Sequence, residues 1–215
     1  EPTLSDLEYL ARQAGEILRS GYNPRPSFGN SFEVDQKGVV DLVTDIDRRS
    51  EAYLLHEIHH RFPHDRVIAE ESGGLAGSNS CIWYIDPLDG TINYAHGIPI
   101  FCVSIAWQHD NVLRLGVVYD PIHDECFSAE SGRGAWLNSQ PIRVSNIQLL
   151  DQSLLVTGFP YDIRTNPDNN LDHFARLHLL SQGVRRLGSA ALDLCYVAAG
   201  RFDGFWEISI YPWDI

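Results

Sequence analysis

The chain has 215 residues, and its 29 acidic residues outnumber its 16 Lys and Arg residues to give a formal net charge of -13 at pH 7. Binding to nucleic acid or to an anionic membrane surface needs a basic footprint, so this charge excludes both kinds of partner. Hydrophobic residues make up 44% of the chain, which excludes disorder as its main state. Since a domain takes roughly 100–200 residues, we expect one domain or two small ones that share an interface.

Two helices separated by a loop are predicted at the start of the chain. Ser5 and Glu8 have the S-x-x-E form of a capping box, and apolar residues then recur at helical spacing to about Gly21. Residues 23–38 combine Pro, Gly and polar residues, which predicts a loop or an irregular hairpin. A second helix is predicted over residues 45–62, where a proline follows.

Strands dominate the middle of the chain, and good turn sequences between them predict an antiparallel meander. The predicted strands are residues 66–69, 82–86, 101–107, 112–119, 125–129 and 154–157. Two further helices are expected over residues 171–181 and 189–199, where apolar residues recur at helical spacing. Helices that flank a run of strands indicate an α+β fold built in layers.

The cysteines indicate a reducing compartment. Cys81, Cys102, Cys126 and Cys195 are far apart in the sequence and form no C-x-x-C pair for zinc or redox chemistry. We expect them to be buried and reduced. No segment reaches the about 18 apolar residues of a membrane span, and the first residues lack the layout of a signal peptide. The sequence therefore predicts a cytoplasmic protein that does not bind membranes.

Carboxylates gather in pairs at the ends of three predicted elements: Asp45 and Asp47, Glu70 and Glu71, Asp86 and Asp89. For Asp45 and Asp47, capping of the following helix is a sufficient explanation. Asp86 and Asp89 flank a rigid Pro-containing turn, which would present several oxygens to one hard cation such as Mg²⁺. Gly90 allows close approach of the backbone, and amides exposed there would suit a phosphate. In isolation, the D-P-x-D-G segment could equally be an ordinary turn.

Several segments in a fixed order resemble the signatures of the inositol monophosphatases, which belong to the lithium-sensitive, magnesium-dependent phosphatase superfamily. They are residues 41–47 (DLVTDID), 70–72 (EES), 83–93 (WYIDPLDGTIN), 188–191 (GSAA) and 212–214 (PWD). The resemblance implies a layered α/β/α/β/α sandwich of the inositol monophosphatase and fructose-1,6-bisphosphatase type. Residues 1–150 would form an N-terminal half with most metal ligands. Residues 151–215 would start a C-terminal half that this chain contains only in part, because family members continue further.

The resemblance implies a site for two Mg²⁺ ions, and it leaves open a third ion beside Glu70. Glu70, Asp86 and the carbonyl of Leu88 would hold one ion. Asp86, Asp89 and Asp214 would hold the second, so that Asp86 bridges the two. Two such ions would stabilise the attacking and leaving oxygens of an in-line displacement and would activate a water molecule.

Catalytic and phosphate-binding residues follow from the same resemblance. Thr91, hydrogen-bonded to Asp47, would position the water, and Glu70 would act as the base. The phosphate would lie against the amides of Gly90 and Thr91. No covalent phosphoenzyme is implied.

The leaving alcohol would be bound by Asp89, Ser189, Ala190, Glu207 and Asp214. Acidic acceptors of this kind suit a polyol, although Glu207 could also be an ordinary carboxylate on a strand face. Lys37 resembles the residue of a mobile loop that approaches the phosphate, although a single loop lysine is more often only solvated.

The resemblance therefore implies hydrolysis of a small phosphomonoester, in the first place inositol monophosphate, by a lithium-sensitive homodimer whose substrate is a small sugar or polyol phosphate. Within the superfamily, a fructose-1,6-bisphosphatase or a phosphatase for 3'-phosphoadenosine phosphates or NADP stays open as an alternative. So does a protein of a different class, which would retain the fold but act mainly as the partner of another macromolecule, with hydrolysis secondary.

One competing motif points to another chemistry. His56 and His60 complete an H-E-x-x-H sequence, the pattern in which two histidines one helical turn apart hold zinc in a protease. On a helix both would lie more than a right angle from the apolar side that Ile58 marks, and so would face solvent. No third ligand stands out nearby, and we therefore reject a zinc protease.

Overall fold

The computed structural model describes residues 1–24, 34–36 and 42–215 and begins with the helix α1 (Leu4–Gly21). Thr3 caps this helix: its hydroxyl accepts a hydrogen bond from the Asp6 amide, and the Asp6 carboxylate accepts one from the Thr3 amide. The predicted capping box at Ser5 and Glu8 is therefore wrong by two residues. The pair that precedes it already satisfies the free amides of the first turn.

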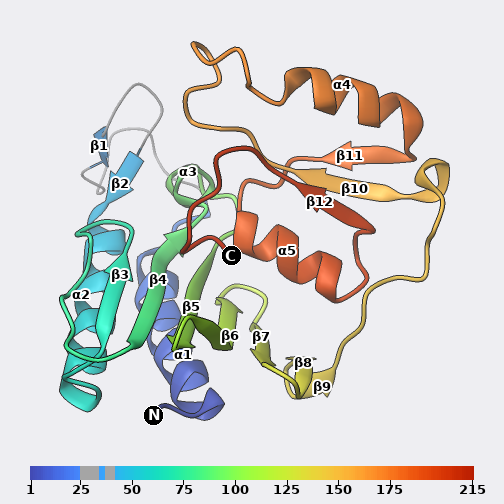
Figure 1. The fold of residues 1–215 in the computed structure, drawn as a ribbon. Helices are drawn as coiled ribbons and strands as arrows, with labels where there is room; N and C mark the ends of the chain where they lie inside the picture. Colours follow the sequence, from blue (N-terminus) through green and yellow to red (C-terminus); the bar gives the residue numbers. More distant parts are fainter. Residues whose placement is uncertain (25–33, 37–41) are drawn as a thin grey trace.

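Helix α2 (Asp45–Arg61) packs beside α1, and both lie on the same face of a large sheet (Figure 1). The predicted apolar face of α1 is confirmed, because its residues at helical spacing are fully buried: Leu7, Leu10, Ala11, Ala14 and Leu18. Leu54 and Ile58 of α2 complete this side of the main hydrophobic core.

The large sheet has seven strands in the order β3-β4-β5-β6-β7-β8-β9. They are β3 (Arg66–Ala69), β4 (Cys81–Asp89), β5 (Cys102–His109), β6 (Val112–Asp120), β7 (Glu125–Glu130), β8 (Gly134–Leu137) and β9 (Gln140–Pro141). The predicted antiparallel meander is confirmed from β4 onward, whereas β3 pairs parallel to β4. The predicted hairpin region contains β1 (Val34–Gln36), which pairs antiparallel to β2 (Leu42–Thr44).

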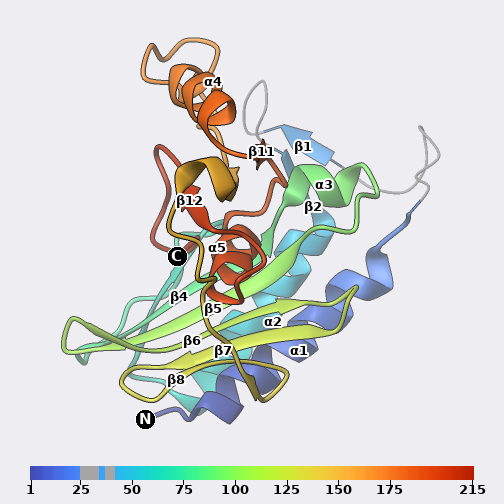
Figure 2. The ribbon, with the colours of Figure 1, turned by 90° about the vertical axis from the view of Figure 1, so that its right-hand side faces the viewer.

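A second sheet lies beyond the helix α5 (Ala190–Ala198), which packs against β5 and β6 on one side and β10 and β12 on the other. Its strands are parallel in the order β11-β10-β12, and their bounds are β10 (Leu154–Thr157), β11 (Gly183–Arg185) and β12 (Gly204–Trp206). The outermost helix, α4 (Leu171–Leu180), contacts β11. Figure 2 shows this order of layers from the side, and the predicted α/β/α/β/α arrangement is confirmed.

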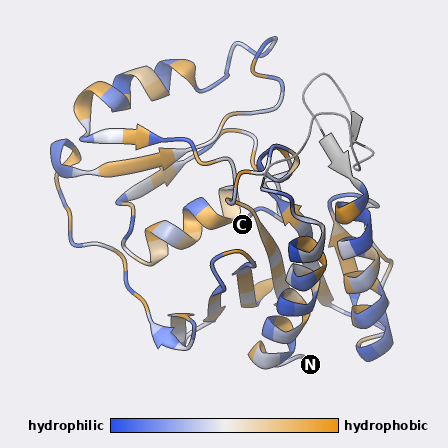
Figure 3. Cartoon of the chain, turned by 180° about the vertical axis from the view of Figure 1, so that it is seen from behind, coloured by the Kyte–Doolittle hydropathy of each residue, from blue (hydrophilic) through white to orange (hydrophobic). Residues whose placement is uncertain are grey.

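The segment between the two sheets contains a short 3-10 helix, Leu150–Gln152. The predicted division of the chain at residue 150 falls within this segment and stays a prediction. In Figure 3 the hydrophobic residues concentrate on the strands, while α1 and α2 show many hydrophilic residues on the side turned away from the sheet. Within the described ranges, no helix has the length and apolar composition that crossing a membrane would require.

All four cysteines are free thiols, as predicted. Cys81, Cys102 and Cys126 are buried, while Cys195 is only partly so. Together with Phe127 and Leu192, Cys102 belongs to a second, smaller core between α5 and the large sheet.

Candidate active site

An irregularity in β4 brings two carboxylates to the same side of the sheet. Asp86 pairs with Ser104 of β5 and Asp89 with Cys102, so three steps along β4 match only two along β5. Side chains three residues apart on a regular strand point to opposite faces, and the one extra residue of this bulge cancels that alternation. The predicted Pro-containing turn between Asp86 and Asp89 is therefore wrong: the segment is a bulge within a strand.

Polar contacts fix the shape of the bulge. The amide of Leu88 donates to Oδ1 of Asp86 over 2.9 Å, and the buried hydroxyl of Ser50 on α2 donates to the carbonyl of Pro87 over 3.0 Å. Asp86 itself is 1% exposed. The orientation of its carboxylate is therefore set by the fold.

Helix α3 (Thr91–Ala95) begins directly after the bulge. Its N-terminal cap, Gly90, has φ +96°, a left-handed conformation that other residues rarely adopt. A Cβ on Gly90 would also lie 2.8 Å from the carbonyl oxygen of Ile100, so glycine is required there. The hydroxyl of Thr91 donates to the carbonyl of Leu88 over 3.1 Å.

A pocket of about 800 Å³, a volume that includes its open mouth, lies where β4, α3 and α5 meet the C-terminal segment. Its lining contains ten of the predicted site residues: Glu70, Asp86, Leu88, Asp89, Gly90, Thr91, Ser189, Ala190, Glu207 and Asp214. Residues separated by more than one hundred positions in the sequence thus meet in one place.

Asp47 is the predicted site residue that does not line this pocket. It lies in the first turn of α2 and is 1% exposed. Burial, and after it the charge of Asp47, raises the pKa of Tyr94. Lys37 lies outside the described residues.

Asp89 connects β4 to the start of α5. Its Oδ2 accepts hydrogen bonds from the Ser189 hydroxyl, over 2.7 Å, and from the Ala191 amide, over 2.8 Å. The Sγ of Cys102 lies 3.6 Å from the same hydroxyl. Burial raises the pKa of Asp89, and these hydrogen bonds oppose the shift. The hydrogen bonds from Ser189 and Ala191 both use Oδ2, so neither involves Oδ1 of Asp89.

The charge around Asp86 fits a hard divalent cation. Burial raises the pKa of Asp86 well above its ordinary value, and the charges of Glu70, Asp89 and Asp214 raise it further. Such crowding of carboxylates is relieved by a cation with oxygen ligands. Over residues 1–24, 34–36 and 42–215, however, no three acidic, His or Cys side chains already enclose a metal position. The carboxylates line one pocket and interact electrostatically with one another, and the positions of the ions stay a prediction.

The wall formed by the second half of the chain is also acidic. Burial, with the charges of Asp89 and Asp214, raises the pKa of Glu207 to about 7. Burial raises the pKa of Asp214 to about 6, while a hydrogen bond from the Tyr211 amide, 2.8 Å long, opposes that shift. A Cβ on Gly158 would collide with the carboxylate of Glu207, so a side chain at this position would displace that carboxylate.

Sequence reasoning missed several lining residues, among them Gly158, Arg186 and Asp193. Asp193 could have been noticed, because it lies one helical turn after Ser189 and so on the same side of α5. Arg186 stands two residues before the G-S-A-A segment and gave no pattern of its own. Gly158 had no sequence signal, since its importance depends on where Glu207 folds.

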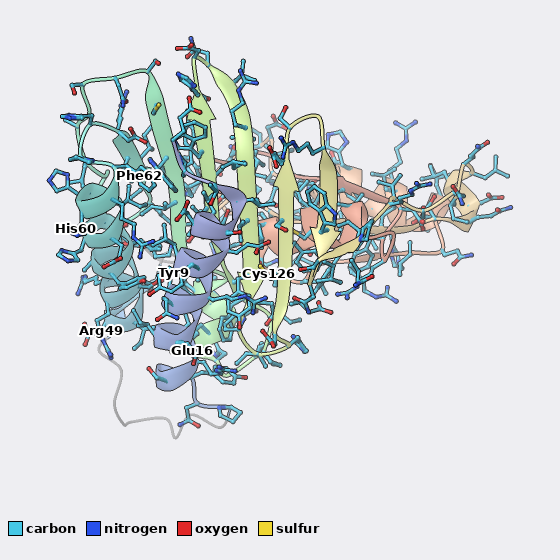
Figure 4. All side chains as sticks on the ribbon, turned by 90° about the horizontal axis from the view of Figure 1, so that it is seen from below. Tyr9, Glu16, Arg49, His60, Phe62 and Cys126 are labelled. Carbon is cyan, nitrogen blue, oxygen red and sulfur yellow. The ribbon has the colours of Figure 1, made fainter. Side chains whose placement is uncertain are left out.

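The H-E-x-x-H motif lies away from the pocket. His56 and His60 are exposed on α2, and their rings stack with centroids 6.3 Å apart. In Figure 4, His60 lies on the outer side of α2, away from the sheet. The predicted orientation toward solvent is confirmed.

Known proteins resemble the chain along its whole length. A profile of the inositol monophosphatase family matches residues 1–215. The inositol-1-monophosphatase of Synechocystis sp. is 47% identical over 214 residues, which is 98% of this chain and 75% of that protein. Nus factor SuhB of Pasteurella multocida is 43% identical over 100% of this chain and 79% of its own length. The structure of an inositol monophosphatase from Anabaena (Nostoc) sp. superposes with a TM-score of 0.83 at 47% identity, covering 96% of this chain and 75% of the other.

Proposed function

The chain belongs to the inositol monophosphatase family, and from this premise we propose that it is a Mg²⁺-dependent phosphatase for the monophosphate of a small polyol such as inositol. The observation that supports this most is the convergence of Asp86 and Asp89 with Glu70 and Asp214 in one pocket. Buried carboxylates of like charge are costly unless a cation or another ligand offsets them.

In the proposed site, Glu70, Asp86 and the Leu88 carbonyl would hold one Mg²⁺, and Asp86, Asp89 and Asp214 would hold a second. Bound there, the ions would supply electrostatic stabilisation of the attacking and leaving oxygens and would lower the pKa of water. The donor set consists of oxygens only, which matches the preference of Mg²⁺. A third ion beside Glu70 would be compatible with the same set.

The chain's own residues orient the ester and the water. The amides of Gly90 and Thr91 bind the phosphate, at the beginning of α3. Glu70 accepts the proton of the attacking water, and the Thr91 hydroxyl helps to position that water. Asp47, which is 1% exposed, would act through Thr91 and not touch the substrate. No covalent phosphoenzyme forms, because no nucleophilic side chain is needed.

The acidic wall favours an uncharged alcohol. Asp89, Glu207 and Asp214 would accept hydrogen bonds from hydroxyl groups of the leaving alcohol, together with Ser189 and the backbone of Ala190. A second phosphate against the same carboxylates would be repelled. This argues for a polyol monophosphate over fructose-1,6-bisphosphate and 3'-phosphoadenosine 5'-phosphate.

The test is release of inorganic phosphate from inositol 1-phosphate, fructose-1,6-bisphosphate and 3'-phosphoadenosine 5'-phosphate at saturating Mg²⁺, with and without Li⁺. We expect the highest kcat/KM for inositol 1-phosphate, and inhibition by Li⁺. A higher kcat/KM for either of the other two esters would overturn the choice of substrate. No release from any of them would overturn the phosphatase itself.

A second function is suggested by the relatives that bear the name Nus factor SuhB, among them the protein of Pasteurella multocida. The name does not describe hydrolysis, and it favours the alternative of a protein that acts mainly as the partner of another macromolecule. Such a role would not need the metal ligands. Asp86→Asn should therefore abolish phosphate release and still restore growth in a strain that depends on a partner function. Loss of both together would argue against this second role.

The proposed setting is the cytoplasm, where the four free thiols would stay reduced. A homodimer is the proposed assembly. Analytical ultracentrifugation of the reduced protein tests the homodimer, since a monomer at all micromolar concentrations would contradict it.

A further inference from the structure

Asp193 is a buried acid in the lining of the pocket, and one of its two carboxylate oxygens is unsatisfied. The residue is 1% exposed, and its Oδ1 forms no hydrogen bond with any residue that the structure describes. Buried polar atoms are almost always hydrogen-bonded, so an exception needs an explanation. The position of Asp193 in the lining of the pocket suggests one, because a ligand there could supply the missing partner.

Capping of α5 does not explain this acid. Acids are common in the first turn of a helix, where they bind its free amides. In α5 those amides are already used: the Ala191 amide donates to Asp89, while those of Leu192 and Asp193 donate to the hydroxyl and the carbonyl of Ser189. The carboxylate of Asp193 is therefore available for another role.

The charged residues around Asp193 indicate which kind of ligand group could bind it. Burial raises the pKa of Asp193 to about 8, the charges of Asp89 and Glu207 raise it, and the charge of Arg186 opposes the shift. A further anion would be repelled by these acids. A neutral carboxyl group can both donate and accept a hydrogen bond, and an ionised one can only accept. A hydroxyl group can also do both, and so fits either protonation state.

We propose that Asp193 binds a hydroxyl group of the leaving alcohol and thereby selects hydroxyl-rich phosphate esters over esters without hydroxyls. This inference rests on the proposed function, because it assumes that the alcohol lies on the α5 side of the pocket. It assigns Asp193 to substrate specificity, separately from the predicted metal ligands on β4.

Binding of two phosphonates in Mg²⁺ tests the proposal without turnover, because a P–C bond is not hydrolysed. One is the methylenephosphonate analogue of inositol 1-phosphate, and the other is phenylphosphonate, which has no alcohol hydroxyl. Dissociation constants are measured by calorimetry for the wild type, Asp193→Ala, Asp193→Asn and the control Asp172→Ala. Asp172 is an exposed acid in the first turn of α4, so its replacement by Ala removes one acidic residue, as Asp193→Ala does.

For Asp193→Ala we expect the Kd of the inositol analogue to rise about tenfold, the usual effect of one lost hydrogen bond. The Kd of phenylphosphonate should stay within about twofold. Asp193→Asn should keep most of the affinity, since a carboxamide also donates and accepts. Asp172→Ala should change neither constant. If Asp193→Ala does not fold, Asp193→Leu keeps the branched shape of the side chain without its polar atoms and should give the same selective loss.

Equal weakening of both analogues would assign Asp193 a structural role and overturn the proposal, as would no change for either. The proposed function fails separately. If the wild type binds the inositol analogue with the expected dependence on Asp193 but releases no phosphate from inositol 1-phosphate, the hydrolysis is wrong and the assignment of Asp193 stands. If the wild type does not bind the inositol analogue, the proposed function and the role of Asp193 are both wrong.

Discussion

Oδ2 of Asp89 accepts a hydrogen bond of 2.7 Å from the hydroxyl of Ser189, although the two residues are 100 positions apart in the chain. Asp89 ends β4 of the large sheet, and Ser189 caps α5, which packs between the two sheets. One bond thus couples the predicted metal ligands on β4 to the predicted alcohol-binding residues on α5.

Asp89→Asn should lower kcat by about 100-fold or more, because it removes a charge that stabilises the transition state through the cation. An amide can still accept the hydrogen bonds from Ser189 and Ala191, so the fold should survive. Initial rates and calorimetric Mg²⁺ titrations measure the effect, with the melting temperature as the control for folding. Full activity with unchanged Mg²⁺ affinity would mean that Asp89 is not a metal ligand.

Gly158→Ala should weaken substrate binding without replacing any of the predicted metal ligands. The new Cβ would displace the carboxylate of Glu207 from its place above Gly158. We expect KM for inositol 1-phosphate to rise about tenfold with a smaller change in kcat, as for one lost hydrogen bond. Gly116→Ala is the matched control, because a Cβ on Gly116 meets nothing within 4 Å. Equal effects of both variants would refute the role given to Glu207.

Without divalent cations, the stability of the protein should fall as the pH rises from about 4 to about 8. Asp193 and Glu207 have pKa values of about 8 and about 7 when folded, against 3.8 and 4.5 as ordinary values. Between these limits the folded state binds more protons than the unfolded state, so each rise in pH favours unfolding. Urea unfolding in EDTA at pH 5 and pH 8 measures the slope.

Asp193→Asn should make that slope shallower, because the amide does not titrate. The variant should gain stability relative to the wild type at pH 8 and differ little at pH 5. An unchanged slope in this variant would show that Asp193 has an ordinary pKa in the folded protein.

Replacing both histidines of the H-E-x-x-H motif should leave phosphate release within about twofold, because surface substitutions away from a site have small effects. His56 and His60 are exposed on α2, outside the pocket. The double variant His56→Ala/His60→Ala is compared with the wild type by initial rates. A loss of more than tenfold would require a function for these histidines.

Helices and strands with a continuous apolar pattern could be predicted from the sequence with good accuracy. The predicted strands at residues 66–69 and 154–157 coincide with β3 and β10, and α2 is one residue shorter than predicted. Strands β8, β9, β11 and β12 were missed, because each has only two to four residues, one of them Gly or Pro, and so gives too little alternation to detect. The parallel pairing of β3 with β4 depends on a connection in space that periodicity does not encode.

The candidate site depended on the resemblance more than on local pattern. The sequence indicated Asp86 and Asp89 as a pair. Their convergence, however, results from a bulge against β5 that could not be predicted from the sequence. Asp193 was missed because an acid in the first turn of a helix has an ordinary explanation. Only the structure shows that other groups already satisfy the amides of that turn.

The most direct measurement of the central claim is phosphate release from inositol 1-phosphate by protein stripped with EDTA, before and after Mg²⁺ is added back. We predict no measurable release in EDTA and full recovery with Mg²⁺, because the carboxylates around Asp86 need a cation to bind and polarise the ester. Undiminished release in EDTA would contradict the account, since the acidic pocket would then work without a metal.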